Sequence, residues 1–301
     1  MFLWAVGFPA AEVLLQSWGV ISLVTVRQVL AIGVLLTIWI YCDGWRQVYH
    51  APWWKAIMVG GLGFGGGGLL LMFGQKYSDA VTPAIAAAMM PIAGAILEVM
   101  LDGRKLRLPL VVGIALAIAG GILATGVKLG DGEFGFGALL CLGAIVLFAW
   151  ATRATTHDFS HLSTIGRTTI TLTGGLVVML IIFLGCYFLQ YDVAAIGNHD
   201  LYNLFLILFF SLVSLAFAHL LWIWAAGNLG ILVASLHMNA VPFYVMVTMV
   251  IVLAGSWNTM QAIGATLVAA GVVLSQLFAR RQLSVFSGIK NNRKTSRNTR
   301  T

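Results

Sequence analysis

Long runs of apolar residues recur along almost the whole chain, and this feature restricts the possible folds more than any other. A helix needs about 20 apolar residues to cross roughly 30 Å of hydrocarbon, and lipid offers no water to unpaired backbone groups. Apolar residues make up 60% of the chain and charged residues only 9%. The sequence therefore predicts an all-α integral membrane protein without a separate soluble domain.

Charged breaks between the apolar runs predict ten transmembrane helices. The expected spans are 2 to 16, 20 to 41, 53 to 73, 80 to 101, 108 to 128, 134 to 153, 166 to 189, 203 to 226, 231 to 254 and 260 to 279. An even number of spans places both ends of the chain on one side. The very short break "GNLG" at 227 to 230 predicts a tight hairpin between the eighth and ninth spans.

Basic residues orient these helices. The segment 281–301 is rich in Lys and Arg, and no acidic residue follows residue 279. This composition predicts a disordered cytoplasmic tail that touches anionic lipid and binds no nucleic acid. The loops on the same side hold most of the other basic residues, which are Arg46, Lys55, Arg104, Lys105, Arg107, Arg153 and Arg167. We therefore expect both termini in the cytoplasm.

The chain contains an internal repeat. An offset of 151 residues aligns "VVGIALAIAGGIL" (111 to 123) with "AIGATLVAAGVVL" (262 to 274), and the same offset superimposes Pro91 on Pro242. Each copy holds five expected spans, so the second copy enters the membrane from the opposite face. Such inverted repeats build the two access states of many secondary transporters. The predicted units are 1–128 and 129–280, each a five-helix repeat.

A membrane-embedded proline followed by G-x-x-L-x-x-A-G-x-x-L, found twice in a chain of this length, resembles the drug/metabolite transporter superfamily and its EamA-type permeases. The opening "FLWAVGFPAA", followed by Arg27, is similar to the start of that family. The resemblance implies a permease in the bacterial inner (plasma) membrane, often an exporter of amino acids or related metabolites. It also implies a cavity formed by spans 1 to 4 and 6 to 9. The family's Gly-Glu pair beyond each proline is absent, because Arg104 and Gly255 stand at the glutamate positions.

Glu12 and Arg27 are the ionisable residues that are most expensive to place in lipid. They are expected at similar depth on consecutive antiparallel helices, so a mutual ion pair is one prediction. In a functional reading, Glu12 binds a proton or a substrate amine and Arg27 holds a substrate carboxylate or a gate. A purely structural pair is the alternative.

Two histidines flank the predicted hairpin at comparable distances from its centre. His219 has Trp222 one turn away, and His237 has Tyr244 two turns away. These four residues together predict a cavity with aromatic walls and two titratable groups. The alternative is that the histidines only form hydrogen bonds between helices.

The stretch "LHMNAVPFYVM" (236 to 246) combines several polar residues with a proline. Pro242 and its repeat partner Pro91 each remove one helical hydrogen bond, so both predict a structural kink beside a cavity. His237 and Asn239 are not repeated in the first half. We therefore expect substrate preference to depend on these two residues.

We expect a secondary transporter that moves a small organic metabolite by alternating access, with protons as a candidate coupling ion. The alternative is a channel or a non-transporting membrane scaffold. An enzyme is disfavoured because the sequence lacks a GxSG elbow, an HExxH motif and a paired-aspartate motif. We expect no cofactor and no metal ion.

Overall fold

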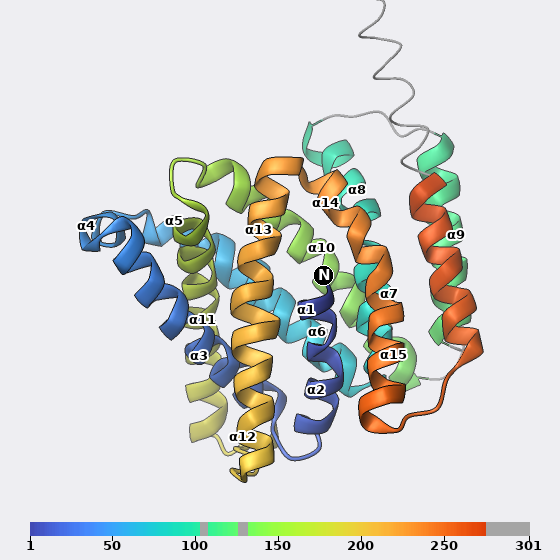
Figure 1. The fold of residues 1–301 in the computed structure, drawn as a ribbon, viewed down its shortest axis with the longest axis horizontal. Coiled ribbons are helices and arrows are strands. Elements are labelled where there is room, and N and C mark those ends of the chain that lie inside the picture. Colours follow the sequence, from blue (N-terminus) through green and yellow to red (C-terminus); the bar gives the residue numbers. More distant parts are fainter. Residues whose placement is uncertain (103–107, 126–131, 275–301) are drawn as a thin grey trace, which may run out of the picture.

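The structure is a computed structural model of the chain and describes residues 1–102, 108–125 and 132–274. Its described residues form helices joined by short loops, with no strand among them (Figure 1). Among the described residues, six helices are long and apolar enough to cross a membrane. They are Val20–Asp43, Trp53–Lys76, Gly135–Asp158, Thr164–Phe188, Leu201–Leu229 and Val233–Leu253. The chain is therefore a multi-pass membrane protein. The predicted basic tail lies outside the described residues.

Further apolar helices fill the remaining places along the chain. Val81–Ala88 and Met90–Leu101 form a pair that bends by 43° at the break between them. The helices Phe2–Leu14, Val111–Ala124 and Thr259–Leu274 are shorter than a full span. Within the described residues every expected span coincides with helical segments, but six helices pass as continuous spans, so ten membrane-crossing helices stay a prediction.

The elements follow one another along the chain as a series of continuous and broken helices. They are α1 (Phe2–Ala5), α2 (Gly7–Leu14), α3 (Val20–Asp43), α4 (Trp45–Tyr49), α5 (Trp53–Val59), η1 (Gly60–Gly66), α6 (Gly67–Lys76), α7 (Val81–Ala88), α8 (Met90–Asp102), α9 (Leu108–Thr125), α10 (Gly132–Asp158), α11 (Thr164–Phe188), η2 (Asp192–Ala194), α12 (Leu201–Leu208), η3 (Phe209–Phe217), α13 (Ala218–Leu229), α14 (Ile231–Ser235), η4 (Leu236–Ala240) and α15 (Val241–Leu253). The helix Thr259–Leu274 follows α15.

The predicted hairpin is confirmed. Only Gly230 separates α13 from α14, and its φ of +80° belongs to the left-handed half of the conformational map that glycine adopts at little cost. This turn brings α14 back beside α13, and the two helices contact each other.

Two membrane helices contain a π-helical segment. The segment η1 joins α5 to α6, and η3 joins α12 to α13. Glycine-rich η1 packs on α10 and α11, while η3 packs on α1, α2 and α3. A π-helix leaves the backbone hydrogen bonds less regular than an α-helix does, and such segments are frequent at functional sites.

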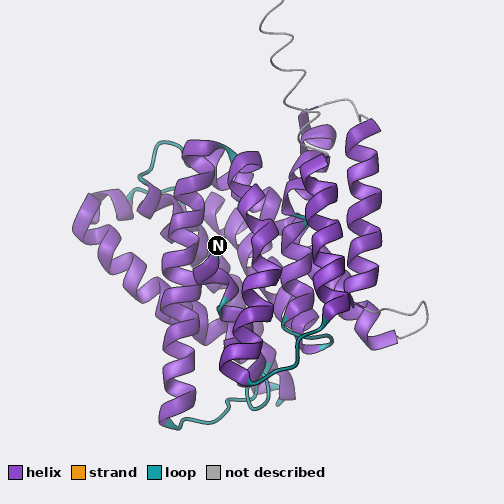
Figure 2. Ribbon diagram, turned by 45° about the vertical axis from the view of Figure 1, so that its right-hand side comes forward, coloured by secondary structure: helices purple, strands orange, loops and turns teal. Residues whose placement is uncertain are grey.

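The helix α9 and the helix Thr259–Leu274 stand side by side at one edge of the molecule (Figures 1 and 2). Glycines bring their backbones close together. A methyl group on Gly120 would lie 2.7 Å from the carbonyl oxygen of Gly264, and one on Gly271 would lie 2.7 Å from the carbonyl oxygen of Gly113. The small residues that define the sequence repeat therefore form this helix contact.

Candidate functional site

A central cavity lies between the helices of both halves. It consists of two adjacent pockets, and both are lined by Trp4, Phe148 and His219. Side chains from α3, η1, α6, α11 and η3 complete the first pocket, and side chains from α8, α13 and η4 contribute to the second. Among the described residues, neither α9 nor Thr259–Leu274 contributes to these two pockets.

Arg27 on α3 lines the first pocket and is only 8% exposed. Its Nε donates to the carbonyl oxygen of Phe210 at 3.3 Å, and one terminal nitrogen donates to that of Ser214 at 3.4 Å. The guanidinium carbon lies 3.9 Å from the centroid of the Phe210 ring, which adds a cation–π contact. Arg27 thus holds the π-helical segment η3 against α3.

The predicted ion pair between Glu12 and Arg27 does not form. Glu12 on α2 accepts instead from Gln75 Nε2 at 3.0 Å, and the same amide donates to the carbonyl oxygen of Phe8 at 2.8 Å. The sequence correctly places both charges on neighbouring helices. It does not show which partners each charge has. Glu12 is bound by Gln75 on α6, and Arg27 is bound by two main-chain carbonyl groups on η3.

His219 and Trp222 both line the cavity from α13. His219 is 6% exposed, its ring meets the Phe64 ring edge to face at 4.5 Å, and its Nε2 is buried without a hydrogen-bond partner among the described residues. Trp222 donates from Nε1 to the hydroxyl of Thr152 on α10 at 3.0 Å. These two residues thus combine an aromatic wall with one unsatisfied nitrogen.

His237 and Tyr244 lie elsewhere. His237 is exposed on η4, and Tyr244 is 37% exposed with its ring against Phe2 at 5.4 Å. Neither lines the central cavity, so the structure does not bring the two predicted histidines together. The 3₁₀ geometry of η4 turns each residue by about 120°, not the 100° of an α-helix, so face assignments made on a straight α-helix shift here.

Asn239 also lies on η4 and is half-buried, with its side-chain oxygen buried and without a partner among the described residues. It belongs to neither central pocket. The following α15 carries Pro242 in its first turn, directly after the 3₁₀ segment. Pro91 occupies the corresponding place in α8, just after the 43° break from α7.

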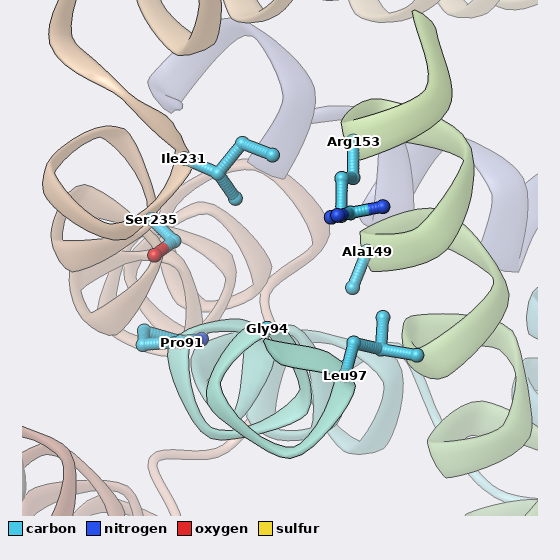
Figure 3. Close-up of a pocket in the computed structure, with 7 residues that line it drawn as sticks. All are labelled: Pro91, Gly94, Leu97, Ala149, Arg153, Ile231 and Ser235. Carbon is cyan, nitrogen blue, oxygen red and sulfur yellow. The ribbon is translucent and has the colours of Figure 1, made fainter. Parts of the chain in front are cut away.

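A third pocket lies toward the end of the molecule where α13 turns into α14 (Figure 3). Figure 3 shows the Arg153 side chain extending from α10 toward a space bounded by α8 and α14. Pro91 and Ser235 line this space as well. In the sequence, Arg153 is explained as one of the basic residues on the cytoplasmic side. The structure places it in a pocket beside Pro91, near the break between α7 and α8.

Gln28 is the cavity residue that sequence reasoning missed. It follows Arg27 on α3, is 4% exposed, lines the first pocket and has a buried Oε1 without a hydrogen-bond partner among the described residues. An amide in the middle of an apolar span is a usable signal, because polar groups in membrane helices are expensive and face the protein interior.

These helices define a polytopic helical membrane protein. A family model described as the EamA-like transporter family matches residues 1–126. Residues 1–126 are therefore similar to the EamA-like transporter family, within the drug/metabolite transporter superfamily.

The full chain is similar to known folds but not to any curated sequence. A solved structure described as "Crystal structure of protein" has a TM-score of 0.69 and 16% sequence identity, and the match covers 93% of this chain and 95% of that chain. At this identity the likeness shows the fold alone. No curated protein sequence matches the chain significantly.

Proposed function

We propose that the protein is a secondary transporter that moves a small organic metabolite by alternating access, with ten membrane-crossing segments arranged as two inverted repeats. The units 1–128 and 129–280 are the two repeats in this proposal. The observation that carries it is a set of paired structural features, each separated by the repeat offset of 151 residues, around one central cavity.

The first pair is the contact between α9 and Thr259–Leu274. Gly271 lies 151 residues after Gly120, and Gly264 lies 151 residues after Gly113. Gly120 contacts Gly264, and the repeat-related residues Gly271 and Gly113 also contact each other. An exchange of the two halves therefore leaves this interface unchanged, as expected for a pseudo-two-fold axis in the membrane plane.

The second pair is formed by the π-helical segments. The offset moves η1 (Gly60–Gly66) onto residues 211 to 217, which lie within η3 (Phe209–Phe217). The packing is exchanged in the same way, since η1 contacts α10 and α11 and η3 contacts α1, α2 and α3. Both segments contribute residues to the first pocket, so a change of helical pairing in either one alters the cavity directly.

The third pair is formed by the proline-associated breaks. The offset moves Met89, at the break between α7 and α8, onto Ala240, the last residue of η4 before α15. Met90 and Met238 beside these breaks both line the second pocket. Irregular backbone at this depth is tolerated where it is buried in protein or faces a cavity.

The cavity supports amino acids or related compounds as the cargo. Arg27 offers a cation for a carboxylate, and the aromatic residues around His219 offer an apolar surface. Glu12 is a candidate proton site, because its carboxylate is held half-buried by Gln75. Export across the bacterial inner membrane, with both termini in the cytoplasm, completes the proposal. The partners are the metabolite, the bilayer and protons, and the activity is transport without catalysis.

Uptake into inside-out vesicles tests the proposal. Purified full-length protein is reconstituted, radiolabelled amino acids and amines are offered, and a pH gradient is imposed or withheld. A proton-coupled exporter gives saturable uptake that collapses without the gradient. The Glu12→Gln variant loses the dependence on the gradient, whereas Lys55→Gln, at the exposed start of α5, keeps it. Flux that never saturates indicates a channel, and no flux indicates a scaffold.

A further inference from the structure

Several polar groups meet in the first pocket without a full set of partners. Arg27, Gln28 and His219 line it, and each is more than nine-tenths buried. The rest of the lining is mainly apolar, with Trp4 and Phe148 shared with the second pocket. Buried polar groups are normally hydrogen-bonded, so a cluster of incompletely bonded ones beside a cavity points to a ligand.

Arg27 is the group that recognises a negative charge. Its two hydrogen bonds to the carbonyl oxygens of η3 use two of its five N–H donors. The other three have no partner among the described residues, and no described carboxylate lies within ion-pair distance. A buried cation of this kind is balanced best by an anion, and a planar guanidinium matches a carboxylate in shape.

Gln28 supplies the complementary acceptor. Its Oε1 is buried without a partner among the described residues, and it comes from the residue next to Arg27 on the same helix. Glu12 does not line either central pocket, and its carboxylate already accepts from Gln75. Among the residues of α3 that line the pocket, Gln28 is therefore the acceptor for an ammonium group that enters with a carboxylate, and His219 on α13 lines the same pocket.

We infer that Gln28 is the specificity-determining residue that selects an α-amino acid over the matching carboxylic acid. In this arrangement Arg27 binds the α-carboxylate and Gln28 Oε1 accepts a hydrogen bond from the α-ammonium. The apolar side chain then points into the second pocket, between Trp222 and Met238. The inference rests on the proposed transport function and refines it.

The second pocket favours a bulky apolar side chain over a small or charged one. Its lining includes the methionines Met1, Met90 and Met238 and the aromatic rings of Trp4, Phe148 and Trp222. Methionine side chains adapt to irregular apolar ligands, and aromatic rings provide broad contact surfaces. A charged side chain would lose much of its hydration there.

The test uses two matched sets of compounds. L-leucine is compared with 4-methylpentanoate and 3-methylbutylamine, and L-phenylalanine with 3-phenylpropionate and 2-phenylethylamine. Binding to the purified full-length protein is measured by isothermal titration calorimetry, and uptake is measured in reconstituted vesicles. The variants are Gln28→Met, which keeps the length but removes the acceptor, and Gln28→Glu, which keeps an acceptor. Gln47→Met on the exposed surface of α4 is the control.

We expect the wild type to bind at least one of the two amino acids about tenfold or more tightly than either analogue, since a hydrogen bond to a charged group has this strength. Gln28→Met should lose the preference for the amino acid over the carboxylate analogue, while its affinity for that analogue stays unchanged. Gln28→Glu should keep the preference for an ammonium group, and Gln47→Met should match the wild type.

Distinct results separate failure of this inference from failure of the transport function. Saturable uptake of the carboxylate analogue as good as that of the amino acid overturns the role of Gln28 and leaves the transporter intact. The role of Gln28 is also overturned if the Gln28→Met variant binds the amino acid and the carboxylate analogue more weakly by the same factor. The thermal unfolding curve of this variant shows that it is folded. Absence of binding to all six compounds also overturns the inference, and non-saturating flux overturns the transport function itself.

Discussion

The contact between α9 and Thr259–Leu274 allows a matched test of the repeat symmetry. Gly120→Ala places a methyl group 2.7 Å from the carbonyl oxygen of Gly264 and 2.8 Å from the backbone nitrogen of Val268, and backbone atoms of two packed helices have little room to yield. A methyl group on the neighbouring Gly121 meets no atom of the described residues within 4 Å. The two substitutions therefore differ in packing and share the change in helix propensity.

Both alanines gain about 1 kcal/mol from the higher helix propensity of alanine, and this gain cancels when the two variants are compared. The remaining difference is the cost of overpacking, which is typically about 1–3 kcal/mol. Gly120→Ala should be less stable than Gly121→Ala by that amount. Gly271→Ala, the repeat-related change, meets the Gly113 carbonyl at 2.7 Å and should show a similar loss.

Titration of the purified protein with sodium dodecyl sulfate in mixed micelles, followed by tryptophan fluorescence, measures the free energy of unfolding. Because one small separation of the two helices relieves both clashes, the double variant Gly120→Ala with Gly271→Ala should lose less than the sum of the single changes. The reasoning is refuted if Gly120→Ala is as stable as Gly121→Ala. A loss at Gly120 without one at Gly271 would show that the contact is not repeated.

Three further outcomes follow from the structure. Trp222→Phe keeps an aromatic ring but removes the donor to Thr152, so the free energy of unfolding should fall by about 0.5–1.5 kcal/mol, and Thr152→Val should add little in that background. N–H groups in the first turn of α12 hold the pKa of Asp200 below its ordinary value of 3.8. The ionised carboxylate therefore stabilises the fold above pH 3.8, and this contribution is lost as the pH falls through the lowered pKa. Protection of these amides from hydrogen exchange should fall as the pH drops from about 5 to about 2. His219→Ala should impair transport while His237→Ala leaves it unchanged, and impairment by both variants would favour the two-histidine cavity expected from the sequence.

The sequence predicts the helical membrane fold well because its signals are local and strong. Apolar length, charged breaks and the glycine at the hairpin each act over a few residues, so the described helices fall at the expected places. The broken helices were only partly foreseen. Pro91 and Pro242 mark two of the irregular sites, whereas no residue pattern in the sequence predicts the π-helical segments η1 and η3.

The candidate site was less predictable because partners are set by tertiary packing. Arg27 and His219 were expected near a cavity and line one, but the contacts of Arg27 with two carbonyl oxygens of η3 depend on helices that are distant in sequence. His237 was expected beside His219 because both lie at similar sequence distances from the hairpin. Such distances indicate the depth in the membrane, but they do not indicate which face of the helix carries the side chain. Gln28 carries no charge, and its place beside Arg27 in an apolar helix does not by itself show that it faces the cavity.

Substrate counterflow tests the central claim most directly, because it separates a carrier from a channel without requiring a driving ion. Vesicles that contain the full-length protein are loaded with an excess of an unlabelled amino acid, and the entry of a trace of the same radiolabelled compound is followed. Alternating access around one cavity predicts transient accumulation of label above the outside concentration, and Arg27→Met should abolish it. A channel would give simple equilibration at the same rate with or without internal substrate, and that result would contradict the account.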